Sequence, residues 1–442
     1  MPECRLEIWA GLECTINRVG DVYFDQLACN GHYRRSSDAD LIADLGATAV
    51  RFPVLWEKHQ PEKTNAPIDW QNAEQNLNRL RERGVEPIVG LVHHGSGPRY
   101  VNFFDGSFES GLSEYAKTVA LKFPWVQRYT PVNEPLTTAR FCGLYGHWFP
   151  HERSDAAFAR ILLSECKATV MSMKAIREIN PNTQLVQTDD LGKTYSTPRM
   201  RYQADFENER RWLSWDLISG LVDRGHPMWS YLIWSGVEEK NLFWFLENGI
   251  KPDLIGLNHY ITSERFLDHN LERYPAYTHG SNGKHRYADV EAVRVKLDEP
   301  TGADRLLREA WERYTSPLAV TEVHLHCSPQ EQLRWFHHIW STANALLNEG
   351  ADIRAVTAWA AFGSHGWNRL LTQSGGDYEP GLFDVRSGEP QETPLAELVR
   401  SLASGSANGF TALSESGWWE LNERILYADI VASNVDTHLK AA

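Results

Sequence analysis

Two glutamates, Glu134 and Glu322, follow apolar runs that are far apart in the sequence. The first run ends in RYTPVNEP (residues 128–135) and the second contains LAVTEVH (residues 318–324). If both runs are strands of one parallel barrel, their carboxyl ends meet at the same mouth and the carboxylates can face one ligand. Cleavage of a glycosidic bond needs such a pair. Carboxyl groups about 5–5.5 Å apart give retention of configuration, and about 6.5–9.5 Å gives inversion.

The elements that must position these glutamates form a repeated pattern of short apolar runs and longer helical segments, as in βα units. We predict strands over residues 5–14, 48–53, 87–93, 128–133, 184–189, 253–259, 318–324 and 353–359. Eight strands fit an α/β fold of the closed (β/α)8 TIM barrel type, with its site at the C-terminal strand ends. A doubly wound sheet would alternate in the same way, but no G-x-G-x-x-G follows the first strand.

Helices are predicted over residues 39–45, 73–83, 108–123, 156–179, 207–221, 238–247, 303–314 and 329–348. The longest irregular segment, 261–300, follows the sixth strand, where loops commonly shape the site. We expect one catalytic barrel over residues 1–403. The tail, residues 404–442, carries Trp418 and Trp419, which are costly to leave in water, so we expect it to dock on the barrel. A linker toward a partner is the alternative.

The motifs at the predicted strand ends resemble those of glycoside hydrolase family 1, the β-glycosidases, over a framework of about residues 5–403. TPVNEP resembles the family's acid/base segment, and Thr321-Glu322 resembles the T-E of its nucleophile segment. Four further segments match in order, namely VRFPVLWEK with Arg51, LVHHG with His93 and His94, GLNHYITS with Asn258 and Tyr260, and the pair Trp359 and Trp367. Six elements in the correct order make this resemblance specific.

The resemblance implies a role for each matched residue. Glu134 becomes the acid/base and Glu322 the nucleophile of a retaining β-glycoside hydrolase that needs no cofactor. Arg51 is the cation beside the nucleophile, and Tyr260 hydrogen-bonds it. The remaining implied contacts are with the sugar: Asn133 with the 2-hydroxyl, His93 with another hydroxyl, Asn258 within the same site, and Trp359 and Trp367 as indole walls.

Three positions depart from the family pattern. Glu13 stands where the first strand of the family offers a glutamine to the 3- and 4-hydroxyls, and Gly366 replaces a glutamate that grips the 4- and 6-hydroxyls. His94 replaces a tryptophan. Because a site built to bond a hydroxyl rejects analogues that lack it, these changes predict a glycone other than plain glucose. Loss of the contact at Gly366 is expected to leave room for a substituted, 6-deoxy or further-linked sugar.

Two alternatives from other classes stay open at this point. Histidines and an aspartate at strand ends could hold zinc for a metal-dependent barrel hydrolase; the candidate ligands are His93, His94, His324, His326 and Asp190. The chain could also be a carbohydrate-binding barrel that has lost catalysis, although both glutamates argue against it.

The composition narrows the choice of partners. The formal net charge of −14 repels phosphate backbones and anionic lipids, so neither nucleic acid nor a membrane surface is an expected partner. Six scattered cysteines form no C-x-x-C pair, which favours free thiols. No leader pattern or apolar run of 18 or more residues occurs, so we expect a cytoplasmic protein that acts on a carbohydrate. The oligomeric state is not indicated by the sequence.

Overall fold

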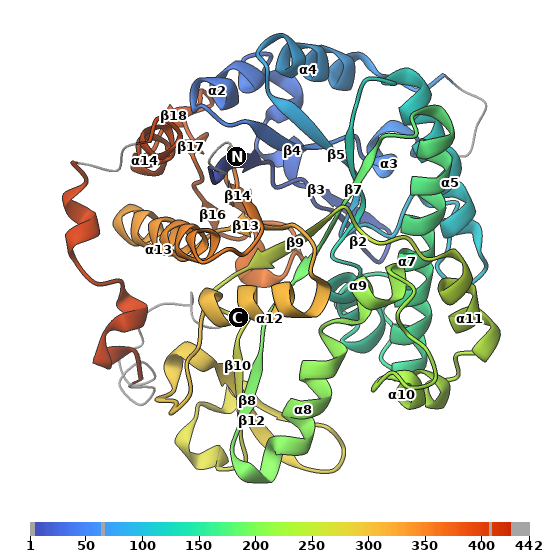
Figure 1. Ribbon diagram of the computed structural model, residues 1–442, viewed down its shortest axis with the longest axis vertical. Coiled ribbons are helices and arrows are strands. Elements are labelled where there is room, and N and C mark those ends of the chain that lie inside the picture. Colours follow the sequence, from blue (N-terminus) through green and yellow to red (C-terminus); the bar gives the residue numbers. More distant parts are fainter. Residues whose placement is uncertain (1–4, 63–66, 406–408, 426–442) are drawn as a thin grey trace.

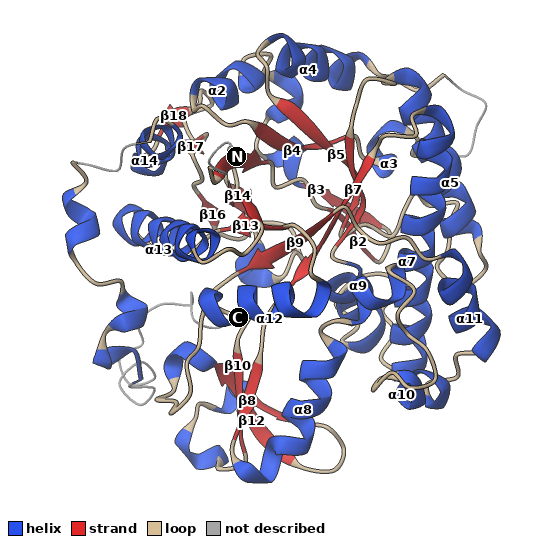
Figure 2. Ribbon diagram, in the orientation of Figure 1, coloured by secondary structure: helices blue, strands red, loops and turns tan. Residues whose placement is uncertain are grey.

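The computed structural model describes residues 5–62, 67–405 and 409–425, and its centre is a closed barrel of eight parallel strands (Figures 1 and 2). Around the barrel the strands follow one another in the order β1, β14, β13, β9, β7, β6, β5 and β4. Their bounds are β1 Glu7–Gly11, β4 Ala49–Pro53, β5 Glu86–His93, β6 Arg128–Asn133, β7 Gln184–Asp190, β9 Leu254–His259, β13 Leu318–Val323 and β14 Ile353–Ala358. The predicted TIM barrel and its eight strands are therefore confirmed.

Helices surround the barrel (Figure 2), and most of their buried apolar residues belong to one core cluster with residues of the strands. Their bounds are α2 Asp38–Asp44, α4 Gln71–Glu82, α5 Ser107–Lys122, α7 Asp155–Ile179, α8 Arg201–Arg210, α9 Leu213–Ile218, α10 Trp229–Trp234, α11 Glu239–Asn248, α12 Ala303–Tyr314, α13 Pro329–Asn348 and α14 Pro394–Ala403. The prediction of one helix over residues 207–221 was wrong, because the chain breaks between α8 and α9 there. The prediction also missed α14, the helix that follows the last strand.

The barrel interior is filled rather than hollow. One cluster takes a buried apolar side chain from seven of the strands: Trp9, Ala49, Ile88, Val186, Leu254, Ala319 and Ala355. These side chains fill the barrel interior, as in TIM barrels generally, whose ligand sites lie at the C-terminal ends of the strands. The larger core cluster lies between the strands and the surrounding helices.

The insertion after β9 is more regular than the sequence predicts. It contributes β10 Arg265–Asp268, β11 His279–Ser281 and β12 Arg286–Glu291, which join β8 Thr194–Ser196 in a four-stranded sheet. A separate small core lies under this sheet, formed by Tyr195, Phe266, Ala288, Val290 and Ala292. In Figure 1 this lobe lies below the ring of barrel strands, beside α8.

Residues 409–425 lie beside α13. Arg334 of that helix donates from Nε to the carbonyl of Ala412 at 2.8 Å, and the ring of Trp419 lies 5.1 Å from that of Trp335. The predicted barrel boundary at residue 403 stays a prediction, and residues 426–442 of the predicted tail lie outside the described residues.

The cysteines and the apolar character of the helices bear on two further expectations. Cys14, Cys29, Cys142, Cys166 and Cys327 are free thiols, and Cys4 lies outside the described residues. Within the described part of the chain, no helix combines the length and apolar character that crossing a membrane requires.

Candidate active site

The strand order brings the predicted functional residues to one mouth of the barrel. Arg51 lies in β4, His93 ends β5, Asn258 lies in β9 and Glu322 lies in β13. Glu134 follows β6 directly and caps the short helix α6 Pro135–Ala139, with a left-handed backbone at φ 49°. This sharp turn is held because the amide of Leu136 donates to Asp189 Oδ2 at 2.9 Å.

Glu322 is buried, and both of its carboxylate oxygens have donors. Arg51 donates from Nη1 to Oε1 at 2.6 Å and to the carbonyl of Thr321 at 2.9 Å. The Tyr260 hydroxyl donates to Oε2. Because these two donors come from the ends of two different strands, β4 and β9, they hold the carboxylate in one orientation, as a nucleophile requires.

The two carboxyl groups hold protons with different strengths. Burial raises the pKa of Glu322 to about 7, while Arg51 and the Tyr260 hydroxyl oppose this rise. The pKa of Glu134 is raised well above its usual range, first by burial and then by the negative charge of Glu322. Glu134 therefore keeps a proton under conditions in which Glu322 is ionised, which divides the pair into an acid and an anion.

This order of ionisation predicts a bell-shaped pH profile of kcat/KM. Glu322 must be ionised to attack, so the rate is expected to fall as the pH decreases through about 7. Loss of the Glu134 proton is expected to produce the fall at higher pH. Because the Tyr260 hydroxyl favours the charged form of Glu322, Tyr260→Phe is expected to move the acidic limb to higher pH. Initial rates across the pH range measure both limbs, and an unmoved acidic limb contradicts the role of Tyr260.

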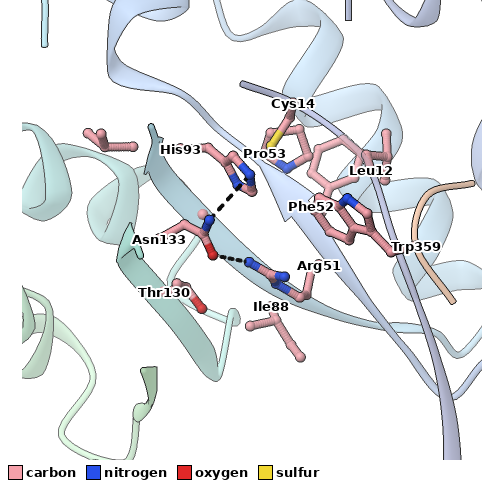
Figure 3. Close-up of a pocket in the computed structure, with 12 residues that line it drawn as sticks. Leu12, Cys14, Arg51, Phe52, Pro53, Ile88, His93, Thr130, Asn133 and Trp359 are labelled. Carbon is pink, nitrogen blue, oxygen red and sulfur yellow. Dashed lines mark hydrogen bonds between the residues drawn. The ribbon is translucent and has the colours of Figure 1, made fainter. Parts of the chain in front are cut away.

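Asn133 connects the acid to the nucleophile. Its Oδ1 accepts from Arg51 Nη2 at 2.5 Å, and its Nδ2 donates to His93 Nε2 at 3.3 Å (Figure 3). Asn258 Nδ2 donates to Glu134 Oε1 at 2.5 Å and lies 3.4 Å from Asn133 Oδ1. His93 therefore accepts at Nε2 and carries its hydrogen on Nδ1.

Aromatic rings form one wall of the site. The Trp359 indole lies parallel to the His93 ring at 5.6 Å, and the Arg51 guanidinium lies 4.8 Å from its centre. A side chain at Gly11 would come within 2.4 Å of this indole, so only glycine allows the ring to lie there. The half-buried Trp367 has a buried Nε1 in the same wall, and this N–H, like that of Trp359, opposes the rise that burial causes in the pKa of the Glu13 carboxyl.

A small cavity opens against this network (Figure 3). Its lining combines apolar barrel residues with the polar groups Arg51, His93, Thr130 and Asn133, and Trp359 closes one side.

Glu13 also lies in this site, on the segment after β1. Its Oε1 accepts from the amide of Thr15 at 3.0 Å and from the Thr15 hydroxyl at 2.6 Å, and its Oε2 accepts from Trp359 Nε1 at 3.3 Å. These donors are all neutral, and burial raises the pKa of the Glu13 carboxyl. The structure thus brings a third carboxyl group to the wall that Trp359 forms.

Trp148 is a site residue that sequence reasoning missed. It is buried, donates from Nε1 to the carbonyl of Leu370 at 2.8 Å, and packs against Trp367 and His94 with ring centres 6.2 and 5.5 Å away. Leu370 and Leu371 both have a left-handed backbone, so this bond supports a strained turn beside Trp367. Its position depends on the path of the loop after α6, for which the sequence carries no periodic signal.

Backbone lies where a side chain at Gly366 would project. A Cβ atom at this position would lie 2.9 Å from the carbonyl oxygen of Gly375, and the backbone has φ +73°. The segment 375–376 therefore covers the direction in which a side chain would project. The expectation that the lost glutamate contact leaves room for another sugar stays a prediction.

Gly366→Glu is consequently expected to destabilise the protein by about 1–3 kcal/mol through backbone strain and this clash, and to give no gain on glucosides. Thermal unfolding measures the effect. Gly388→Glu is the matched control, since Gly388 also has positive φ but no atom within 4 Å of its added Cβ. Equal losses of Tm in the two variants would contradict the argument.

The histidines of the metal alternative have other partners. His324 Nε2 lies 2.7 Å from Glu379 Oε2 and His326 Nδ1 lies 3.5 Å from Glu379 Oε1, whereas the His93 and His94 rings pack on each other. In the described ranges, no three His, Cys, Asp or Glu side chains are grouped as a metal site requires. The structure therefore does not assemble the predicted ligand set.

Comparisons of the sequence with known proteins all point to one family. The profile of Glycosyl hydrolase family 1 matches residues 6–374. Beta-glucosidase 4 of Oryza sativa subsp. japonica is 22% identical over 428 residues, covering 85% of this chain and 86% of that protein. Beta-glucosidase 25 of the same plant is 27% identical over 421 residues and covers 84% of each.

A solved family 1 β-glucosidase from Thermotoga maritima has the same fold. Its TM-score is 0.72 at 16% identity, and the match covers 92% of this chain and 99% of that one. The family match spans the barrel strands that carry Glu134 and Glu322. The predicted family is confirmed: the chain belongs to glycosyl hydrolase family 1 and is a glycoside hydrolase.

Proposed function

We propose that this protein hydrolyses a β-linked glycoside with net retention, using Glu322 as the nucleophile and Glu134 as the acid/base. The observation that carries the proposal is the pairing of Glu322 with Arg51 and Tyr260, beside a Glu134 that burial and the charge of Glu322 keep protonated. A carboxylate held by two donors can attack the anomeric carbon, while the neighbouring acid protonates the departing oxygen.

The second half of the reaction reverses the roles of the acid/base. Once Glu322 carries the sugar as an ester, its negative charge is gone, and one cause of the raised pKa of Glu134 disappears. Glu134, ionised after giving up its proton, then takes a proton from water as the water attacks the anomeric carbon. The ester bond to Glu322 breaks, and the sugar leaves with its original configuration.

We infer further that the glycone is not plain glucose. Glu13 offers acceptors backed only by neutral donors, and Gly366 brings no side chain to the site. His93 remains as a donor for a sugar hydroxyl. The relatives named β-glucosidases share about a fifth to a quarter of their residues with this chain, so their names alone do not fix its glycone.

A panel of aryl β-glycosides tests both parts of the proposal. We expect the glucoside to be a poor substrate relative to the best glycone, and Glu13→Gln to raise kcat/KM on the glucoside by roughly tenfold, because an amide both donates and accepts. Proton NMR of the first product should show the β-anomer. Glu389→Gln, on an exposed loop, is the control. An α-anomer first would refute retention, and a glucoside preference unaltered by Glu13→Gln would refute the glycone inference.

A further inference from the structure

His94 lies beside the acid/base rather than along the indole wall. Its Nε2 is 3.8 Å from Glu134 Oε2, and its Nδ1 is 3.1 Å from the hydroxyl oxygen of Thr138. Both His94 and Glu134 have left-handed backbone, at φ 54° and 49°, so two strained turns aim these side chains at each other. The His94 ring is fixed in place by packing against the rings of His93, Trp148 and Trp367.

The hydrogen-bond partners decide where the imidazole carries its proton. Burial lowers the pKa of His94 to about 3, so the ring is neutral and has one donor and one acceptor nitrogen. The Thr138 hydroxyl is fully buried, and among the described residues its side chain has no other partner than His94 Nδ1. If the hydroxyl donates to Nδ1, the buried hydroxyl proton has an acceptor, and Nε2 carries the hydrogen of the ring. The opposite tautomer would leave a buried hydroxyl proton unpaired.

The two oxygens of Glu134 are not equivalent. Oε1 accepts from Asn258 Nδ2 at 2.5 Å, whereas Oε2 makes no hydrogen bond within the part of the chain that the structure describes. The catalytic proton therefore belongs on Oε2, the oxygen that His94 faces. When that proton leaves, Oε2 becomes an anion with an N–H group 3.8 Å away. Bonds of this kind are commonly long in an empty site and shorten as charge develops.

We propose that His94 is a positioning residue for the acid/base: its Nε2–H closes onto Glu134 Oε2 as Glu134 ionises, and Thr138 fixes the tautomer that makes this possible. The contact is absent while Glu134 is neutral and strengthens when it is an anion. The contact therefore stabilises the Glu134 anion twice: when Glu134 gives its proton to the departing oxygen, and when the anion then activates water. This inference rests on the proposed role of Glu134.

Other charged groups around the pair act in both directions. The charges of Glu322, Asp190 and Asp189 raise the pKa of Glu134, while Asn258 lowers it. Arg140 Nη2 lies 3.6 Å from Asp190 Oδ2, and the charge of Arg51 adds to burial in lowering the pKa of His94. Of these neighbours, His94 is the neutral group whose hydrogen faces the unbonded oxygen, so removing it should raise the pKa of Glu134 without altering the surrounding charges.

The test compares His94→Phe, His94→Gln, Thr138→Val and Thr138→Ser in the full chain. His94→Phe removes the donor but keeps a ring, and we expect the basic limb of kcat/KM to move up by about one pH unit. We also expect kcat on a dinitrophenyl β-glycoside, for which water attack limits the rate, to fall roughly tenfold. His94→Gln supplies an N–H in a similar place and should return the basic limb of kcat/KM to the parental pH. Thr138→Val should reproduce part of the shift, and Thr138→Ser should not.

Several outcomes would overturn the inference. The His94 ring would only have a packing role if the basic limb of His94→Phe stayed at the parental pH. The same conclusion would follow if kcat fell equally in His94→Phe and His94→Gln. If His94→Phe does not fold, Thr138→Val against Thr138→Ser decides, and identical profiles for those two variants would count against the proposal. Glu134→Gln is measured alongside. A fully active Glu134→Gln would refute the proposed function itself, whereas an inactive one with parental His94 variants refutes only this inference.

Discussion

Replacing Glu322 with alanine is expected to lower kcat on the best aryl β-glycoside by roughly 10⁴–10⁶-fold, because the covalent step loses its nucleophile. The side chain is buried and held by Arg51 and Tyr260, so no neighbouring carboxylate can take its place without moving. Alanine leaves a space on the face of the sugar from which Glu322 would attack. Added azide should enter it, restore turnover in part and yield the α-glycosyl azide.

Initial rates with and without azide, with product analysis, measure this prediction. Glu389→Ala is the matched control, since that glutamate is exposed on a loop and should leave the rate unchanged. Turnover of Glu322→Ala near the parental rate, or azide rescue that yields a β-azide, would contradict the assignment of Glu322 as the nucleophile.

Replacing Glu134 with alanine is expected to have an effect that depends on the leaving group. With a poor leaving group, protonation is essential, and the rate should fall by roughly 10²–10⁴-fold. With a dinitrophenyl group, which departs without a proton, the sugar should still be transferred to Glu322. The ester should then accumulate, because water lacks its base, and a burst of dinitrophenol should precede slow turnover.

The product formed with azide distinguishes Glu134→Ala from Glu322→Ala. It needs no general base, so it should attack the ester in Glu134→Ala and yield the β-glycosyl azide. The basic limb of the pH profile should also disappear, because the group that loses its proton there is gone. Equal losses on good and poor leaving groups would show that Glu134 does not donate the proton.

The barrel strands could be predicted to within about three residues at each end, and for a simple reason. Strands buried on both faces give short apolar runs without periodic polar residues, and all six residues of β13 are buried. The helix α14 was missed although its signal is present, with Pro394 at the first turn and buried Leu395, Leu398 and Leu402. The lobe from the 261–300 insertion was harder, because β10 pairs with β8 across about seventy residues.

The positions of site residues were predictable where a single sequence motif contains the residue and the strand end that holds it. The segments around Glu134 and Glu322 place both residues at strand ends before any contact is known. Contacts between motifs were not predictable in the same way. The position of His94 against Glu134 depends on two left-handed turns, and the Trp148 bond to Leu370 depends on two loops from different strands. Such features come from the tertiary path of loops, which local propensity does not determine.

Trapping the covalent intermediate tests the central claim most directly. The 2-deoxy-2-fluoro analogue of the best aryl β-glycoside, with a dinitrophenyl leaving group, should inactivate the enzyme with one sugar bound per chain. Trypsin should release the label on the peptide from residues 314 to 334, and fragmentation should place it on Glu322. A label on any other residue, or turnover of the fluoro sugar without a trapped ester, would contradict the account.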